Sequence, residues 1–341
     1  MGRPSAATSR LTDPVADSPE VGRERREAPP ARTLRRVPDI VALLPPLADR
    51  VSVLLDAAEA DDGARALSEH AELALRADRL PVEGLVHLGV AVGDALLAYA
   101  QVEMPPDGPV TVEAVVHPGH RRDGTGAGLR DAVLARAPGR EVRAWAHGDH
   151  PGAAALAAGV GARRVRELLQ MQRRFDSDPD GLDEPVLPQG VRLRAMRPGA
   201  DEDAWLAVNA RAFSSHPEQG AWTRADLAAR MVEPWFDAAG VLLAEDEASG
   251  ELLGFHWTKV HAATAERPAV GEVYVLGVDP AAQGRRLGGA LTLAGLRHLR
   301  GLGLDAVLLY VEADNALALR VYRGLGFEVV RVDVQYCLTP A

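Results

Sequence analysis

The chain has 341 residues, of which 47% are apolar and 25% charged, and its formal net charge is -10. This composition is typical of a soluble globular protein, and the length exceeds what one hydrophobic core usually organises. The acidic balance argues against a nucleic-acid partner, which requires clustered basic charge. No run approaches the roughly 18 apolar residues of a membrane span, and the first 40 residues lack the apolar stretch of a signal peptide. We therefore expect a cytoplasmic protein without a membrane partner.

The cysteine and histidine content limits the chemistry further. Cys337 is the only cysteine, which excludes an intramolecular disulfide and a thiolate metal cluster. We interpret it as a structural thiol on the last strand, because a nucleophile would need an activating neighbour. The ten histidines show no zinc-binding spacing. The sequence therefore predicts no metal.

The first half of the chain is predicted to contain a tail, one domain and a linker. Residues 1–38 hold six prolines and eight arginines without a periodic apolar face, which is typical of a disordered tail. Residues 39–175 form the first predicted domain, and residues 176–190, rich in Asp and Pro, the linker. The first domain is expected to contain helices at Arg50–Ala60 and Leu67–Ala77, a hairpin of strands Gly84–Val92 and Ala95–Val102 across a Gly93-Asp94 turn, and a strand at Val110–Val116.

The second predicted domain, residues 191–341, repeats this order. Its predicted strands are Val191–Met196, Val241–Ala244, Leu252–Val260, Glu272–Val278, Ala306–Glu312 and Phe327–Leu338. Its predicted helices are Asp201–Phe213, Thr223–Met231 with Thr223 as N-cap, Arg286–Arg300 and Ala316–Gly324. Helices laid against a mostly antiparallel sheet indicate an α+β fold.

One sequence pattern occurs in both predicted domains. Val116, Pro118, Arg121, Gly126 and Leu129 recur 162 residues later as Val278, Pro280, Gln283, Gly288 and Leu291. Trp145, Asp149, Gly159 and Gly161 recur 165 residues later as Tyr310, Asp314, Gly324 and Gly326. A match at so long a period indicates tandem domains, because the units of a solenoid are much shorter.

The repeated turn has the features of an anion site. Gly284, Gly288 and Gly289 allow a ligand to approach the backbone closely, and the free N–H groups of the following helix point toward it. A pyrophosphate would fit. A tight turn required only for packing is the alternative reading of such a glycine-rich segment, but the recurrence of the pattern favours binding.

The repeated turn, followed by Asn315 and by Tyr322-x-x-Leu325-Gly326-Phe327, resembles the Gcn5-related N-acetyltransferases. The resemblance implies two tandem domains of that family, each with a mixed, mostly antiparallel sheet flanked by helices, and acetyl-CoA as co-substrate. Arg286 stands where glycine is usual; either Gly284 absorbs the turn or Arg286 adds a phosphate contact. The residues implied to bind acetyl-CoA are Leu276, Gly277, Val278, Gln283, Gly284, Arg285, Arg286, Leu287, Gly288, Gly289, Asn315, Ala316, Leu317, Ala318, Leu319 and Arg320 in the second domain, and Ala114, Val115, Val116, Arg122, Asp123, Gly124, Thr125, Gly126 and Ala127 in the first.

The segments 215–220 and 271–280 make the resemblance narrower. Together with the tandem arrangement they resemble family members that acetylate the cysteinyl amine of a cysteinyl-glucosaminyl-inositol. The resemblance implies a small-molecule amine as partner, and Lys259, the only lysine among 38 basic residues, as a contact of its hydroxyls. The implied acceptor-binding residues are Glu69, Glu218, Lys259, Glu272 and Tyr310.

Glu272 and Tyr322 are the predicted catalytic pair. Strand alternation places Glu272 on one face with Tyr274, Leu276 and Val278, beside the cofactor turn. A carboxylate there can act as general base on an amine whose reference pKa is near 8. The resemblance implies that Tyr322, which would otherwise be read as a core aromatic, acts as general acid for the departing thiolate, partly as a hydrogen-bond donor. The backbone N–H near Val278 is expected to polarise the thioester carbonyl.

The first domain keeps the turn but lacks this pair. Val110 takes the place of Glu272, Ala157 that of Tyr322, and His150 that of Asn315. We therefore expect a non-catalytic first domain, which either binds acetyl-CoA without turnover or completes the acceptor cleft.

The sequence thus predicts a monomeric, acetyl-CoA-dependent N-acetyltransferase. One alternative is an acetyltransferase for another small-molecule or peptide amine. Another, from a different class, is a non-catalytic acyl-CoA sensor, against which Glu272 and Tyr322 argue.

Overall fold

The computed structural model describes residues 40–42, 47–76, 84–176, 181–214, 217–264 and 267–340, with backbone alone at residues 217 and 218. The predicted tail, residues 1–38, lies outside the described residues. Residues 37–341 form one compact unit. We call its described parts the N-lobe, residues 40–176, and the C-lobe, residues 181–340. None of the helices in the described residues is long and apolar enough to cross a membrane.

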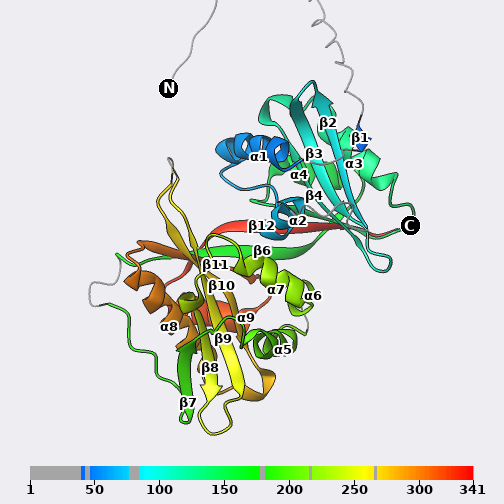
Figure 1. Ribbon diagram of the computed structural model, residues 1–341. Coiled ribbons are helices and arrows are strands. Elements are labelled where there is room, and N and C mark those ends of the chain that lie inside the picture. Colours follow the sequence, from blue (N-terminus) through cyan, green and yellow to red (C-terminus); the bar gives the residue numbers. More distant parts are fainter. Residues whose placement is uncertain are drawn as a thin grey trace, which may run out of the picture. The chain divides into compact units, whose positions relative to one another are not determined.

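The strands of both lobes join in one sheet, which twelve described strands form in the order β1-β2-β3-β4-β5-β12-β6-β11-β10-β9-β8-β7. Figure 1 shows the sheet passing from the N-lobe to the C-lobe through β12 and β6. The strands are β1 (Val41–Ala42), β2 (Leu85–Val92), β3 (Ala95–Glu103), β4 (Val110–Val116), β5 (Val142–Ala146), β6 (Arg163–Arg174), β7 (Val191–Ala195), β8 (Val241–Asp246), β9 (Leu252–His261), β10 (Val270–Val278), β11 (Ala306–Glu312) and β12 (Glu328–Leu338).

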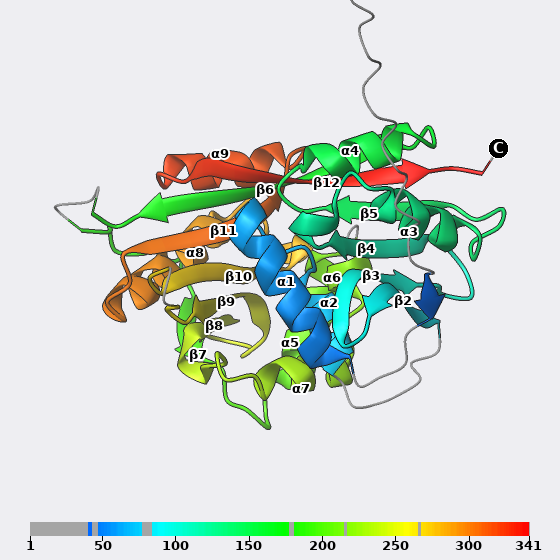
Figure 2. The same cartoon turned by 90° about the horizontal axis from the view of Figure 1, so that it is seen from above.

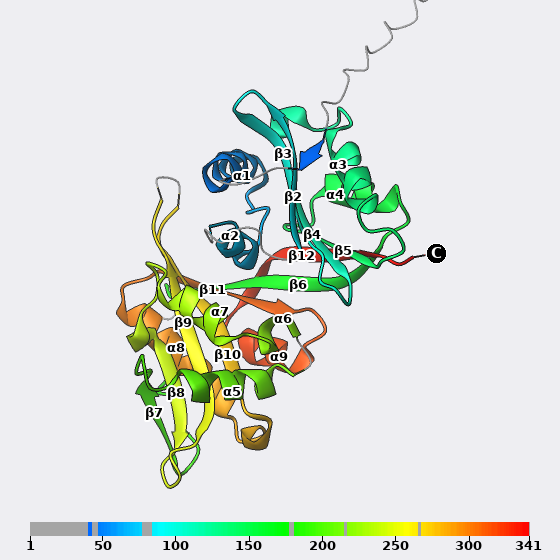
Figure 3. The ribbon, with the colours of Figure 1, turned by 45° about the vertical axis from the view of Figure 1, so that its right-hand side comes forward.

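Helices cover both faces of the N-lobe sheet. The helices α1 (Ala48–Asp62) and α2 (Glu69–Arg76) lie on one face, and α3 (Thr125–Leu134) and α4 (Pro151–Ala158) on the other (Figure 3). Leu54 and Leu55 of α1 pack with Tyr99 of β3, whereas Leu129 of α3 packs with Leu88 of β2. Two apolar clusters therefore sandwich the sheet, and burial of their side chains favours the layered arrangement.

The C-lobe is built in the same way. The helices α5 (Glu202–Ala212) and α7 (Arg224–Met231) cover one face, where Trp205 packs on Phe255 and Trp257 of β9. The helices α8 (Leu287–Gly301) and α9 (Ala316–Gly324) cover the other face, and the short α6 (Pro217–Gly220) follows α5. Three 3-10 turns complete the described elements: η1 (Pro118–His120), η2 (Ala238–Gly240) and η3 (Pro280–Ala282).

The sequence predicts a linker between two domains at residues 176–190, but the sheet continues from one lobe to the other. The last strand of the N-lobe, β6, pairs with β11 of the C-lobe, and the last strand of the C-lobe, β12, pairs with β5 of the N-lobe. The two exchanged strands pair with each other (Figure 2). The two predicted domains therefore share one continuous sheet, because each lobe takes its final strand from the other half of the chain.

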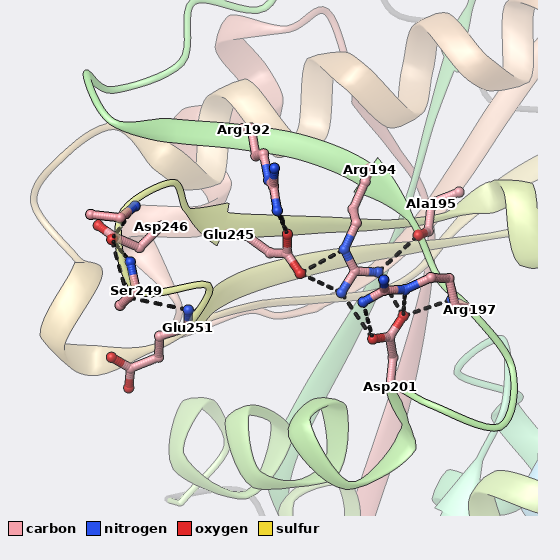
Figure 4. Close-up of polar contacts among 10 residues, drawn as sticks. Arg192, Arg194, Ala195, Arg197, Asp201, Glu245, Asp246, Ser249 and Glu251 are labelled. Carbon is pink, nitrogen blue, oxygen red and sulfur yellow. Dashed lines mark hydrogen bonds and ion pairs between the residues drawn. The ribbon is translucent and has the colours of Figure 1, made fainter.

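A buried ion network anchors the edge strand β7 to β8 and α5 (Figure 4). The guanidinium of Arg194 donates to Glu245 at 2.6 Å and to Asp201 at 2.6 and 2.9 Å. Asp201 also accepts from the backbone N–H of Arg197 at 2.7 Å, and Glu245 accepts from Arg192 at 3.0 Å. Because both carboxylates are buried and fully paired, the network defines how α5 meets the sheet.

Most predicted elements are present with small shifts of their ends. The strands Val110–Val116 and Ala306–Glu312 and the helix Ala316–Gly324 have the predicted bounds, and Thr223 caps α7 through a capping box. Sequence reasoning did not assign β1, α3, β5, α4, β6 or α6. Of the predicted linker, residues 181–188 carry no helix or strand, and residues 177–180 lie outside the described residues.

The exchanged strand β12 leads to a testable prediction. Val334 is fully buried where β12 crosses between the lobes, and Val330 on the same strand is 54% exposed. We expect Val334→Asp to destabilise both lobes together by about 3 kcal/mol or more, because it buries an unpaired charge. Hydrogen exchange should show lost protection in β5 and β11 alike. Val330→Asp is the control, and loss of protection in one lobe only would contradict the shared strand.

Candidate active site

The site lies where the parallel strands β10 and β11 of the C-lobe separate. Their pairing ends at Val273 and Leu309, so the backbone of Tyr274–Val278 pairs on one edge only, with β9. The N-lobe strands β4 and β5 separate in the same way after Glu113 and Trp145. Each gap exposes strand backbone, which can bind a ligand that adds hydrogen bonds to the free edge.

A bulge in β10 changes the predicted arrangement of side chains. The register against β9 shifts between Val273 and Val275, with Tyr274 as the extra residue. Tyr274 packs with the aromatic cluster of Trp257, whereas Leu276 and Val278 pack on the opposite face against α8. The prediction that Glu272 shares one face with Tyr274, Leu276 and Val278 is therefore wrong for the last two, because the bulge reverses the alternation.

Four of the residues predicted to bind the acceptor substrate lie on one face of the sheet. We call this face, with Glu69, Lys259, Glu272 and Tyr310, the acceptor face. Glu272 is 6% exposed and lies opposite Lys259 of β9 and Leu308 of β11. Tyr310 follows two residues after Leu308, so strand alternation places it on the same face. Glu69, the first residue of α2, reaches this face from the N-lobe. The side chain of Glu218 lies outside the described residues.

Lys259 is held in place by one carboxylate and two aromatic rings. Its ammonium donates to Glu69 and lies 4.5 Å from the ring centre of Trp235 and 5.1 Å from that of Tyr274. Only 9% of the side chain is exposed. Cation–π attraction and the ion pair together fix the ammonium at the boundary between the lobes. The structure thus brings a carboxylate and an ammonium to the acceptor face.

Glu272 and Tyr310 each have a partner that the sequence did not indicate. His261 at the end of β9 lies 2.6 Å from Glu272, measured from Nε2 to Oε2. The hydroxyl of Tyr310 accepts from Gln170 of β6 at 2.9 Å and from Arg331 of β12 at 3.1 Å. Both donors of Tyr310 therefore come from the exchanged strands.

The turn after β10 offers a row of free donors. No backbone N–H from Gly284 to Gly289 donates to another residue within the described part of the chain. The row opens the 15-residue helix α8, where the positive end of the helix dipole adds to the attraction for an anion. Gln283 donates back to the carbonyl of Val278 at 3.4 Å. The geometry suits a pyrophosphate.

The backbone conformation of the two turns explains how arginine can stand at position 286, where glycine is usual. Both turns hold two left-handed residues: Arg122 (φ 61°) and Gly124 (φ 99°) in the N-lobe, and Gly284 (φ 77°) and Arg286 (φ 63°) in the C-lobe. Glycine and arginine have exchanged places between the turns. Gly284 does not absorb the turn, because Arg286 is itself left-handed and caps α8. Such a conformation costs a non-glycine residue about 1 kcal/mol or more.

Tyr322 lies in α9, and its hydroxyl is available to a ligand within the described residues. Its ring packs edge-on against Phe327, with ring centres 5.8 Å apart, and burial raises its pKa to about 12. Its hydroxyl bonds to no other described residue, and Asn315 caps the helix by accepting from Ala318 at 3.1 Å. A thiol of reference pKa about 8.5 is roughly 3.5 pH units more acidic, so complete proton transfer would be uphill by about 5 kcal/mol.

In the N-lobe turn, some of the hydrogen-bond donors are already paired and the start of the following helix is covered. The carboxylate of Asp123 accepts from the backbone N–H of Thr125 at 3.0 Å and from its hydroxyl at 2.7 Å. A Cβ on Gly126 would lie 3.2 Å from Leu156 of α4, so α4 covers the first turn of α3. The equivalent Gly288 would meet only Val278, at 3.8 Å. An anion in the N-lobe would thus compete with Asp123, and the C-lobe turn is the more open one.

Sequence reasoning missed His261, Gln170, Arg331, Trp235 and Arg230 around the acceptor face. Arg230 donates to the hydroxyl of Tyr274 at 2.9 Å and stacks over Trp222. The repeat contained a signal for two of these residues, because Arg331 and Gln170 match Arg166 and Gln335 at the spacing of 165.

In the described residues no group of three or more His, Cys, Asp or Glu side chains could hold a metal ion.

The left-handed Arg286 gives a second prediction. We expect Arg286→Gly to raise the free energy of unfolding by about 1 kcal/mol, because it relieves backbone strain. Arg285→Gly is the matched control, since Arg285 has a negative φ, and should be neutral or destabilising. Urea denaturation measures both. A destabilised Arg286→Gly variant would show that the arginine side chain contributes more than the strain costs.

Comparison with known proteins agrees with this geometry. The model of the acetyltransferase (GNAT) family matches residues 205–327. A GCN5-related N-acetyltransferase from Sphaerobacter thermophilus has a TM-score of 0.65 at 24% identity, covering 90% of this chain and 96% of its own. A tandem GNAT protein from the clavulanic acid biosynthesis pathway has a TM-score of 0.66 at 23% identity, covering 88% and 98%. These structures confirm the predicted α+β fold of tandem acetyltransferase domains.

Curated relatives define the family more narrowly. The mycothiol acetyltransferase of Thermomonospora curvata is 52% identical over 299 residues, covering 87% of this chain and 96% of the relative. That of Streptomyces avermitilis is 51% identical over 306 residues, covering 89% and 95%. With this identity over nearly the whole length, and with the repeated turn and acceptor face in place, the chain belongs to the mycothiol acetyltransferase family.

Proposed function

We propose that the protein transfers acetyl from acetyl-CoA to the cysteinyl amine of 1D-myo-inositol 2-(L-cysteinylamino)-2-deoxy-alpha-D-glucopyranoside, giving mycothiol and CoA. The observation that carries the proposal is the acceptor face, where Glu69, Lys259, Glu272 and Tyr310 from both lobes meet beside the separated strands. Two carboxylates, one ammonium and one phenol hydroxyl can form hydrogen bonds to a polar, hydroxyl-rich acceptor. An acyl-CoA sensor would have no need of such a face.

We propose that acetyl-CoA binds at the C-lobe turn and along the free edge of β10. The N–H groups of Gly284–Gly289 would hold the pyrophosphate, and the backbone near Val278 would polarise the thioester carbonyl. Asn315–Arg320 would border the same molecule. The N-lobe turn, Arg122–Ala127 with Ala114–Val116, is proposed as a second, non-catalytic site, where Asp123 weakens binding.

Glu272 is proposed as the general base. The attacking amine must lose a proton as its nitrogen bonds to the acetyl carbon, and Glu272 is the buried carboxylate on the acceptor face. The C–S bond then breaks, and Tyr322 donates a hydrogen bond to the sulfur as its negative charge develops. Because the pKa of Tyr322 is about 12, it donates in its neutral form throughout the physiological range.

The N-lobe is proposed to complete the acceptor cleft without reacting. It supplies Glu69 to the cleft, and Val110 and Ala157 stand where the C-lobe has its base and its tyrosine. The monomeric state and the cytoplasmic location remain predictions.

The roles of Glu272 and Tyr322 predict unequal losses of activity. We expect Glu272→Ala to lower kcat/KM by roughly a hundredfold to a thousandfold, because it removes the general base. Tyr322→Phe should lower it about tenfold, because one hydrogen bond is lost. Steady-state CoA release measures both, with Glu251→Ala in the exposed β8–β9 turn as control. Equal or reversed losses would contradict these roles.

The choice of acceptor is tested with matched compounds. We expect CoA release with the cysteinyl-glucosaminyl-inositol, and none with the same compound already acetylated on the cysteinyl nitrogen or lacking the cysteine. Unrelated amines should react at least a hundredfold more slowly. Turnover of other amines only would remove the mycothiol assignment. Tight acetyl-CoA binding without turnover of any amine would favour the sensor.

A further inference from the structure

A buried histidine between the lobes has no part in the proposed reaction. His147 follows β5, and its ring lies between Glu113 of β4 and Asp333 of β12. Nδ1 is 3.1 Å from Asp333 Oδ2, and Nε2 is 3.3 Å from Glu113 Oε2. The three side chains are 12%, 11% and 3% exposed, for histidine, glutamate and aspartate respectively. A carboxylate at each ring nitrogen requires both nitrogens to donate, so the ring is an imidazolium.

One side of this cluster leads to Glu69. The carboxylate of Glu113 accepts from the hydroxyl of Ser68 at 2.7 Å and from its backbone N–H at 2.5 Å. Ser68 immediately precedes Glu69 and α2, and its hydroxyl accepts from the backbone N–H of Ala71 in the first turn. Glu113 therefore sets where α2 begins and where Glu69 projects toward Lys259.

The other side leads to Tyr310. Asp333 accepts from the backbone N–H of Gly148 at 2.8 Å, and its Oδ1 lies 3.3 Å from the Nε of Arg331. Arg331 in turn donates to the hydroxyl of Tyr310 at 3.1 Å. His147 thus connects to one acceptor residue through the N-lobe and to another through the exchanged strand β12.

We propose that His147 is a positioning residue for the acceptor, which holds Glu69 and Tyr310 in register across the two lobes through Glu113 and Asp333. This inference rests on the proposed function for its substrate. It makes one residue responsible for the alignment of two contacts that come from different lobes. Substrate contact by His147 itself is not required.

The charge state of the cluster defines a pH window. Burial by itself lowers the pKa of His147, but its bonds to Asp333 and Glu113 raise that pKa to about 9. The pKa values of Glu113 and Asp333 are lowered, since their bonds to His147 outweigh burial. Other titratable or charged groups nearby are His70 and Tyr99 beside Glu113, and Arg331 and Tyr310 beside Asp333.

The sign of the pH dependence follows from these shifts. The folded pKa of His147 exceeds its unfolded value of about 6.5, so its stabilisation is complete below that pH and is lost as pH rises through 9. The two carboxylates stabilise above their unfolded pKa values near 4 and lose this effect as pH falls. Alignment of the acceptor face should therefore weaken above pH 9.

The test is His147→Gln in the full chain, with His120→Gln, at a half-buried histidine of η1, as control. We expect the KM for the cysteinyl-glucosaminyl-inositol to rise roughly tenfold, while the KM for acetyl-CoA changes less than twofold. The ratio of acceptor KM values, variant over wild type, should approach one above pH 9, because the wild-type ring then loses its charge. The acceptor's own ionisation cancels in that ratio. An unchanged acceptor KM, or equal rises in both KM values, would overturn the proposal.

A second measurement separates this proposal from the proposed function. Hydrogen exchange of His147→Gln without substrate should show faster exchange in α2 and β11, with α8 and its turn unchanged. Glu113→Gln, which keeps an acceptor for Ser68, should give a weaker form of the same pattern if His147→Gln fails to fold. Wild-type protein without turnover would refute the function alone, whereas unchanged exchange in both variants would refute the role of His147 alone.

Discussion

The structure depends on the exchange of β6 and β12 between the lobes. Because β12 pairs with β5 on one edge and with β6 on the other, it closes the N-lobe sheet and joins it to that of the C-lobe. The two donors to Tyr310, Gln170 and Arg331, lie on these strands. Neither lobe could complete the acceptor face alone. The N-lobe part of the chain therefore contributes Glu69 and Gln170 to the face on which the proposed acceptor site lies.

The equivalent turns of the two lobes differ in how accessible their N–H donors are to a ligand. In the C-lobe turn six consecutive N–H groups have no partner among the described residues, and one left-handed position is an arginine. In the N-lobe Asp123 occupies donors of the turn, and Leu156 of α4 covers the start of α3. The less regular sequence thus has the more accessible turn. Both turns have left-handed residues at the same two positions, so the side chains around the turn, rather than agreement with a motif, account for the difference in access.

Polar groups at the acceptor face are costly to bury, and their pairing explains how the fold tolerates them. Lys259 contacts Glu69 and two aromatic rings, Glu272 lies within hydrogen-bond distance of His261, and His147 contacts two carboxylates. The pairs of Lys259 with Glu69 and of His147 with Asp333 join segments that are distant in sequence, so they form only in the folded chain. Breaking one leaves a buried charge without a partner, which is the costly event. The same pairs therefore support stability and the arrangement of the site.

The sequence by itself determined most of the C-lobe elements, the repeat, the glycine-rich turn and the candidate Glu272, because periodicity, turn residues and spacing are local properties of a chain. Tyr322, Lys259 and Glu69 came from the resemblance to a known family. Only the tertiary structure decided the exchange of β6 and β12, the bulge at Tyr274 and the partners His261, Gln170 and Arg331. Strand pairing between distant segments leaves no local periodicity, since the apolar pattern of β12 would suit either sheet. The register and neighbours of such strands follow from long-range pairing with the edges of both sheets.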